Sequence, residues 1–226
     1  MAGILFIISA PSGSGKSTLV SQLRTLVEGL EFSISYTTRA PRGSEEDGRE
    51  YHFTARERFE RMIAAGEFLE WAEVFGKDYY GTAVSTLEHA KQAGKDLLLD
   101  IDVQGAMQVM KKMPEAVTIF VVPPNPQVLE MRLRNRSEAE QAASKTPISE
   151  AEIEKRLAEA RNELKRIQDY KYALVNDVLD QAVSELRAIV LFERGVRDGV
   201  QAVAASCRTD AASPRLRASL SAFQEL

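Results

Sequence analysis

The sequence predicts an α/β fold with a parallel central sheet, because candidate strands alternate with helical patterns along the chain. The middle two of four candidate strands are apolar runs of the kind buried on both faces, and helical patterns separate all four candidates. The four candidates are Gly3–Ser9, Asp96–Asp100, Val117–Val122 and Tyr172–Val175. Such alternation implies right-handed crossovers and places ligands at the carboxyl ends of the strands. Ala10, Asp100 and Asn176 stand at these ends and are expected to converge on one crevice.

The composition is that of a globular protein and argues against nucleic-acid-binding and membrane-spanning classes. The chain has 226 residues, 44% hydrophobic and 27% charged, which is ordinary for a globular enzyme of one domain with insertions. A net charge of −4 argues against general nucleic-acid binding. The single cysteine, Cys207, rules out an intrachain disulfide or a zinc site built from thiols. No apolar stretch is long enough for a membrane span. We therefore expect a cytoplasmic protein with no membrane, nucleic-acid or indicated protein partner.

A phosphate-binding P-loop follows the first strand. The pattern G-x-x-x-x-G-K-[ST] fits from residue 10 onward, with Ala10 in place of the first glycine. Gly13 and Gly15 allow successive N–H groups to face one anion, and Lys16 can reach the outer phosphates. A lysine at a helix N-terminus opposes the helix dipole unless an anion is bound, which disfavours a plain Gly/Ser turn. The candidate residues are Ala10, Pro11, Ser12, Gly13, Ser14, Gly15, Lys16, Ser17 and Thr18.

The helix after this loop is predicted from apolar residues on one face. These are Leu19, Val20, Leu23, Leu26 and Val27. The segment up to the Asp96 strand departs from the strand–helix rhythm, with a Gly-rich loop at 43–48 and two short helices. A second departure, Ser137–Ile148, is polar and alanine-rich and is expected to be a mobile lid.

These departures define the expected domains. The P-loop core covers 1–33 and 96–195, with a lid at about 136–152. An inserted subdomain covers 34–95, and a C-terminal extension of unassigned role covers 196–226. In this extension the spacing of Leu216, Leu220 and Phe223 suggests only a short amphipathic helix.

Five motifs in the right order resemble the guanylate kinase family, from about residue 3 to residue 194. They are SYTTRAPR at 35–42, GREYHF at 48–53, EWA at 70–72, YYGT at 79–82 and DIDVQG at 100–105. The resemblance implies a P-loop NTPase fold with an inserted GMP-binding subdomain and a lid. It also implies ATP-dependent phosphorylation of GMP and dGMP in purine metabolism, with Mg²⁺ as cofactor.

The resemblance also implies which residues hold GMP. They match Ser35, Arg39, Arg42, Tyr51, Glu70, Tyr80, Thr82 and Asp100. Arginine grips phosphate oxygens in pairs, and tyrosine adds a neutral donor. One carboxylate such as Glu70 can accept from both guanine donors while the Ser35 hydroxyl serves O6, and adenine presents the opposite pattern. Taken alone, the two arginines could be solvated loop residues, and Glu70 an exposed charge at a helix end.

For the transfer step the resemblance implies a set of cations around the phosphates. These catalytic candidates are Lys16, Arg39, Arg132, Arg136 and Arg156. Arg132 and Arg136 share a helix face whereas Arg134 points elsewhere. The lid is several residues longer than is usual in the family, and Arg136 stands at its start.

The remaining assignments have structural alternatives. Asn176 matches a position near the ATP adenine and could equally be a turn residue after a strand. Ser17 is the predicted direct ligand of Mg²⁺, and Asp100 and Asp102 are predicted to act on it through water. Asp102 could equally cap the helix expected at 103–113.

Two other functions use parts of the same pattern. A kinase for a phosphorylated sugar would keep the P-loop but would have no use for Glu70 paired with Ser35. A guanylate-kinase-like binding module would have lost catalysis, whereas Lys16, Ser17 and the arginines are all present here.

Overall fold

The computed structural model describes residues 3–74, 76–144, 149–211 and 213–224. The chain divides into two compact units. The first comprises Met1–Ile7 with Gly29–Ala116, and the second comprises Ile8–Glu28 with Val117–Leu226. A five-stranded sheet runs in the order β2-β7-β1-β8-β9, and both units contribute residues to β1 (Leu5–Ser9).

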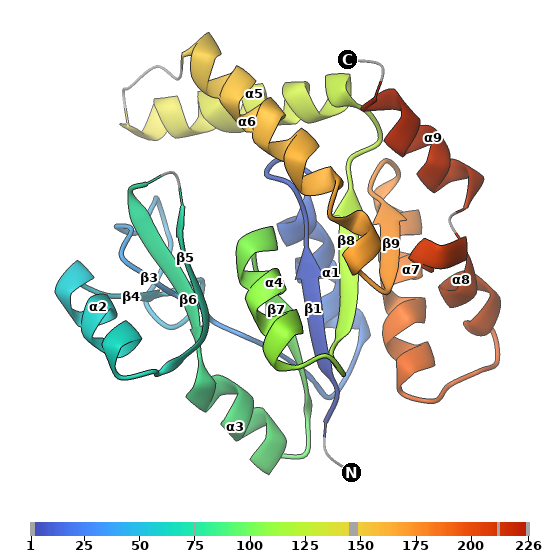
Figure 1. Cartoon of the computed structure of the whole chain (residues 1–226), viewed down its shortest axis with the longest axis horizontal. Helices are drawn as coiled ribbons and strands as arrows, with labels where there is room; N and C mark the ends of the chain where they lie inside the picture. Colours follow the sequence, from blue (N-terminus) through green and yellow to red (C-terminus); the bar gives the residue numbers. More distant parts are fainter. Residues whose placement is uncertain (1–2, 75, 145–148, 212, 225–226) are drawn as a thin grey trace. The chain divides into compact units, whose positions relative to one another are not determined.

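The first unit contains the strands β2 and β7 of this sheet and two helices, one before and one after β7 (Figure 1). Its elements are β2 (Leu30–Phe32), α3 (Val84–Gln92), β7 (Asp96–Asp100) and α4 (Val103–Lys112). β2 pairs with β7 in parallel, with Leu30 opposite Asp96 and Phe32 opposite Leu98. The centre of β7 is fully apolar and buried because it lies inside the sheet.

The first unit also holds a separate four-stranded sheet in the order β4-β3-β6-β5. Its elements are β3 (Tyr36–Thr37), β4 (His52–Phe53), α2 (Arg56–Ala64), β5 (Phe68–Val74) and β6 (Asp78–Ala83). β5 and β6 form an antiparallel pair next to α2 (Figure 1). Phe59 of α2 stacks on Phe68 and Tyr79, with ring centroids 4.3 and 5.3 Å away, so an aromatic core fixes the helix on the sheet.

The second unit carries the other side of the five-stranded sheet. Its elements up to residue 193 are α1 (Lys16–Leu26), β8 (Val117–Val122), α5 (Pro126–Ser144), α6 (Glu150–Leu164), the 3-10 turn η1 (Ile167–Asp169), β9 (Tyr172–Val175) and α7 (Leu179–Glu193). β8 and β9 pair in parallel and are buried along their whole length. Leu19 and Leu23 of α1 are fully buried, as the helical pattern predicts.

The last segment of the second unit lies beside the end of the sheet. It forms α8 (Gln201–Ser206), η2 (Thr209–Ala211) and α9 (Pro214–Ala222). Figure 1 shows these elements in red next to β9. Cys207 is a free, buried thiol, and burial raises its pKa to about 12, so the group is neutral.

The predicted α/β fold with a parallel central sheet is confirmed, and all four predicted strands are present. Three features differ from expectation. Sequence reasoning missed the short strand β2. Leu26 was expected on the buried face of α1 but is 49% exposed, because the helix ends there. The segment from Ser137, expected to lie between two helices as a mobile lid, is helical as far as Ser144.

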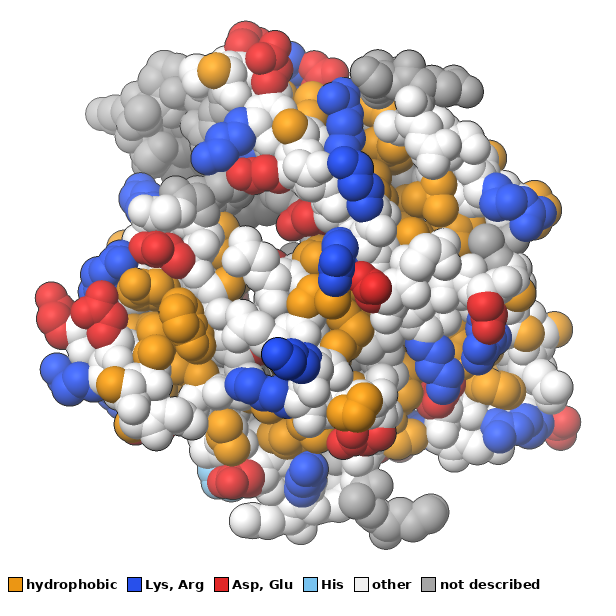
Figure 2. All heavy atoms as spheres, in the orientation of Figure 1, with side chains coloured by type: hydrophobic (Ala, Val, Ile, Leu, Met, Phe, Trp, Pro, Cys, Tyr) orange, Lys and Arg blue, Asp and Glu red, His pale blue; other side chains and the backbone are white. Residues whose placement is uncertain are grey.

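Figure 2 shows Lys and Arg side chains interspersed with Asp and Glu over one face of the molecule. In the described residues no helix combines the length and the apolar character that crossing a membrane requires.

Candidate active site

The strands of the four-stranded sheet bring the predicted base-binding residues together in the first unit. Glu70 of β5 lies opposite Thr82 of β6, and both are buried. The Ser35 Oγ is 3.4 Å from the Thr82 Oγ1. Glu70 is only 3% exposed and belongs to a strand, so the alternative of an exposed charge at a helix end is wrong. A carboxylate and two hydroxyls therefore form a buried polar cluster, the acceptor cluster (Ser35, Glu70 and Thr82).

A glycine on α4 makes room for the Glu70 carboxylate. A Cβ atom at Gly105 would lie 2.4 Å from the Glu70 Oε2, far inside van der Waals contact. Gly105 also donates its backbone N–H to the Asp102 Oδ1 at 2.7 Å, which caps α4. The capping interpretation of Asp102 is confirmed, and its role toward a metal stays a prediction. The Glu70 carboxylate thus lies against the first turn of α4, where the helix dipole favours negative charge.

Side chains of α4 also hold the backbone of β5. Gln108 accepts from the Trp71 N–H at 3.3 Å and donates to the Trp71 carbonyl at 2.6 Å, as a neighbouring strand would. Trp71 follows Glu70 directly, so these bonds fix the position of the Glu70 backbone along α4.

Arg39 of the first unit is buried beside the rings of Tyr51 and Phe53. Its guanidinium donates to the Glu45 carboxylate at 3.0 Å and lies 5.3 Å from the ring centroid of Tyr51. Burial alone would lower the pKa of Arg39, but the hydrogen bond to Glu45 and the nearby Tyr80 hydroxyl outweigh it and raise the pKa. Arg39 is 9% exposed and so is not a solvated loop residue.

The tyrosines predicted to hold phosphate meet beside Arg39. The rings of Tyr51 and Tyr80 are 5.8 Å apart, edge to face. Burial raises the pKa of Tyr51, and Tyr80 and Asp100 raise it further, so the hydroxyl remains a neutral donor. Arg42 is exposed, and its backbone N–H donates to Glu45 at 2.8 Å. The structure therefore brings Arg39, Tyr51, Tyr80 and Asp100 together and leaves the Arg42 side chain toward solvent.

The P-loop belongs to the second unit. Gly13 and Gly15 have φ values of 88° and 83°, which are strained for other residues. Gly15 begins α1 without a capping side chain, and no acidic residue lies in the first turn. The first N–H groups of α1 are thus offered to an anion, as expected for a phosphate loop. The Ser14 Oγ is buried without a hydrogen-bond partner in the loop.

Two of the predicted residues hold the P-loop backbone. The Asn176 Nδ2 donates to the Ser14 carbonyl at 2.8 Å. Arg132 of α5 donates to the same carbonyl at 3.2 Å and to the Asn176 carbonyl at 3.0 Å. Burial lowers the pKa of Arg132, and Asp177 opposes this effect. A Cβ at Gly15 would lie 2.5 Å from the Asn176 Nδ2, so this packing requires glycine.

Two further arginines of α5 and α6, Arg134 and Arg156, each have their own surroundings. Arg134 binds Glu130 on its own helix and Glu150 on α6, which confirms that it points away from Arg132. Arg156 is half-buried on α6 beside the buried Ile153. The side chain of Arg136 lies outside the described residues, so its role stays a prediction.

Sequence reasoning missed two residues of the site. Gly105 lies inside a helix, and only the approach of Glu70 reveals why it must be glycine. Glu45 stands among other acidic loop residues, and the spacing to Arg39 was its only signal.

Comparison with known proteins agrees with this geometry. Residues 3–193 match the family model described as guanylate kinase. The chain is 55% identical over 201 residues to a guanylate kinase of Koribacter versatilis, covering 89% of this chain and 83% of that protein. It is 47% identical over 192 residues to a guanylate kinase of Nitrosospira multiformis, covering 85% and 87%. The crystal structure of guanylate kinase from Anaplasma phagocytophilum has a TM-score of 0.68 at 29% identity and covers 94% of this chain and 97% of its own. With a family model spanning most of its length and relatives of this similarity, the chain belongs to the guanylate kinase family.

Proposed function

We propose that this chain transfers the terminal phosphoryl group of ATP to GMP, and to dGMP, giving ADP and the nucleoside diphosphate. The observation that carries the proposal is the buried acceptor cluster beside Arg39, Tyr51 and Tyr80. It combines a carboxylate suited to a base with cationic and neutral donors suited to a phosphate. Both substrates are cytoplasmic metabolites, which supports action in the cytoplasm.

On the acceptor side, Glu70 would accept from guanine N1–H and from the exocyclic amine, while Ser35 and Thr82 can donate to O6. A site of this kind rejects adenine because the wrong base leaves its buried groups unpaired, an effect that can reach roughly 10⁴ to 10⁵. Arg39, Arg42, Tyr51 and Tyr80 would bind the GMP phosphate.

On the donor side, the P-loop amides and Lys16 would bind the ATP phosphates, with Arg132, Arg136 and Arg156 as further cations. The residues present also fit Mg²⁺. Ser17 stands exposed in the first turn of α1 as a single hydroxyl ligand, and the described residues hold no group of three or more His, Cys, Asp or Glu that would form a protein cage. A Mg²⁺ ion bound there would neutralise charge on the phosphate oxygens. Ser17 would bind it directly, and Asp100 and Asp102 through water.

The chemical step needs no general base. A GMP phosphate oxygen, already anionic, forms a bond to the γ-phosphorus of ATP as the bond to the β–γ bridging oxygen breaks, and ADP leaves with that electron pair. The obstacle is repulsion, since two unit charges 4 Å apart interact by about 4 kcal/mol at an effective dielectric of 20. Lys16 and the arginines would oppose this repulsion.

A panel of phosphate acceptors tests the proposal. ADP release is measured with GMP, dGMP, AMP, CMP, UMP and a series of sugar phosphates. Rapid turnover with GMP and dGMP alone supports it. Preference for a sugar phosphate would favour the alternative kinase, and no turnover with any acceptor would favour a binding module.

A further inference from the structure

The residues after 193, which lie beyond the family match, cover one edge of the five-stranded sheet. β9 is the last strand of the five-stranded sheet, and an uncovered edge is open to pairing with other chains. Here the Ala173 N–H donates to the Cys207 carbonyl at 2.8 Å, and Tyr172 forms an antiparallel bridge with Arg208. The chain after α8 therefore acts as a short additional strand along β9.

α9 then docks over the carboxyl end of the same strand. Ser213 caps it by accepting from the Leu216 N–H at 3.2 Å. Leu216 is buried, α9 contacts β9, and the Ser219 Oγ donates to the Pro123 carbonyl, just after β8, at 2.7 Å. The helix is thus fixed where β8 and β9 end, which is the edge that carries Asn176.

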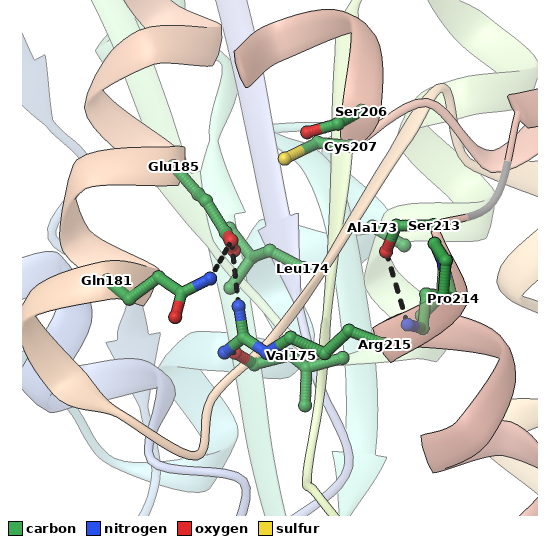
Figure 3. A pocket seen from close by; sticks show the side chains of 11 residues that line it. Ala173, Leu174, Val175, Gln181, Glu185, Ser206, Cys207, Ser213, Pro214 and Arg215 are labelled. Atoms are coloured by element: carbon green, nitrogen blue, oxygen red, sulfur yellow. Dashed lines mark hydrogen bonds and ion pairs between the residues drawn. The ribbon is translucent and has the colours of Figure 1, made fainter.

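Arg215 reaches from α9 to both neighbours of Asn176. It donates to the Val175 carbonyl at 2.6 Å and pairs with the Asp177 carboxylate. It also binds the Glu185 carboxylate of α7 at 2.7 Å. Figure 3 shows Arg215 and Glu185 directed toward each other at a pocket of about 290 Å³, with Gln181 donating to the same carboxylate. One guanidinium therefore ties the turn at residues 175–177 to two helices.

That turn is the support of the P-loop. Asn176 donates to the Ser14 carbonyl, and its own carbonyl accepts from Arg132. Because Arg215 holds the residues on either side of Asn176, it restricts where the Asn176 amide can lie. Without Arg215, Asp177 and Glu185 would lose a shared cation, and the turn would be free to repack.

We infer that Arg215 is a positioning residue for the ATP site, acting through Asn176, and that the C-terminal extension is part of the structure supporting the phosphate loop. The inference rests on the proposed function in assigning ATP to this loop. It gives the extension a role that its sequence alone does not show.

Direct binding tests this role without turnover. The dissociation constants for ATP and for GMP are measured separately by calorimetry on the full chain. Arg215→Ala should weaken ATP binding about tenfold, because small displacements of positioning groups carry such costs, and should leave GMP binding within about twofold. Arg217→Ala, an exposed arginine on the same helix, is the matched control and should bind both as the wild type does. Thermal melts ensure that each variant is compared while folded.

A double-mutant cycle separates positioning from general destabilisation. If Arg215 acts through Asn176, Arg215→Ala should change ATP affinity by less than about twofold in an Asn176→Ala background, whereas independent effects would multiply. Wild-type ATP affinity in Arg215→Ala, or a full additional loss in the double variant, would overturn the inference. A wild-type chain that binds ATP but phosphorylates no acceptor would contradict only the proposed function.

Discussion

Glu70 is a carboxylate with almost no access to water. Its burial would be costly without partners, and the first turn of α4 and the Ser35–Thr82 pair supply a polar surrounding. A buried acceptor of this kind discriminates strongly, because an incoming group that cannot donate leaves the carboxylate desolvated and unpaired. Base selection should therefore depend on this one side chain.

Glu70→Gln should weaken the use of GMP and spare ATP. The amide has one acceptor and presses a donor against a guanine donor, at a cost of about 2 to 4 kcal/mol, or roughly 30- to 1,000-fold in kcat/KM. The measurement is kcat/KM for GMP and AMP together with the ATP affinity. Glu73→Gln, an exposed residue of the same strand, is the control. An unchanged preference for GMP over AMP would show that Glu70 does not read the base.

Glu45 forms an ion pair with Arg39, with a guanidinium nitrogen 2.9 Å from the Glu45 Oε2. Burial tends to raise the pKa of Glu45, but hydrogen bonds from Arg39 and from the Arg42 N–H outweigh it and lower the pKa. A lowered folded-state pKa stabilises the protein fully above the unfolded value, about 4.3, and the contribution is lost as pH falls through the folded value.

Glu45→Gln should therefore reduce the free energy of unfolding by about 1 kcal/mol at about pH 7, and by much less at about pH 3. Urea unfolding of wild type and variant at both pH values measures the difference. Glu46→Gln, an exposed loop neighbour, should cost less at about pH 7. A Glu45→Gln difference that did not shrink in acid would contradict the ion-pair account.

The resemblance implied roles for Glu70, Arg39 and the tyrosines, and their residue types fit those roles, although residue types alone left Glu70 and Arg39 open to a surface interpretation. Residue types could not predict Gly105, since a glycine in a helix carries no mark of what approaches it. Nor could they separate Glu45 from Glu46, because the distinction lies in the fold of the loop.

At the scale of elements, the strands β7, β8 and β9 were predicted with their observed bounds because continuous apolar runs mark them. β2 has three residues including Glu31, which is too short a pattern to stand out. The polar segment from Ser137 was expected to lie between two helices as a mobile lid, but it is rich in Ala, Glu and Gln, whose helix propensity carries α5 to Ser144.

The first turn of α4 gives a test in which helix propensity and packing disagree. Gly105→Ala should stabilise a helix by up to about 1 kcal/mol on propensity alone. Here the added Cβ meets the Glu70 Oε2, so the carboxylate must move. We expect kcat/KM for GMP to fall by about tenfold or more with ATP affinity unchanged. Kinetics with each substrate varied in turn measures this, and an unaltered GMP efficiency would mean that Glu70 relocates without consequence.

At the scale of the molecule, the residues assigned to the two substrates divide between the two compact units. The acceptor cluster, Arg39 and the tyrosines belong to the first, and the P-loop, Arg132 and Asn176 belong to the second. The expected boundaries at 34–95 and 196–226 stay predictions. The C-terminal extension gave no functional signal in sequence because its contacts are to backbone carbonyls and carboxylates of distant segments, such as Val175 and Glu185.

This division makes the two binding functions separable by mutation. Lys16→Ala removes the cation proposed to bind the outer phosphates of ATP and changes none of the residues assigned to GMP. Phosphoryl transfer should fall by more than about 1,000-fold, since the repulsion between the phosphates is then uncompensated. GMP affinity should stay within about twofold of wild type. Steady-state kinetics and GMP calorimetry give the two quantities.

Lys165→Ala, an exposed lysine of the same unit, serves as the control and should change neither. Transfer that stayed within about tenfold of wild type in Lys16→Ala would contradict the P-loop assignment, because removing a phosphate-binding lysine should lower the rate much more than this. A parallel loss of GMP binding would instead show that Lys16 supports both substrates, so that the division into two units would not separate the two binding functions. Glu70→Gln is expected to have the opposite selectivity, weakening the use of GMP and sparing ATP. A general loss of stability would instead weaken the binding of both substrates in both variants, so the two variants together distinguish these causes.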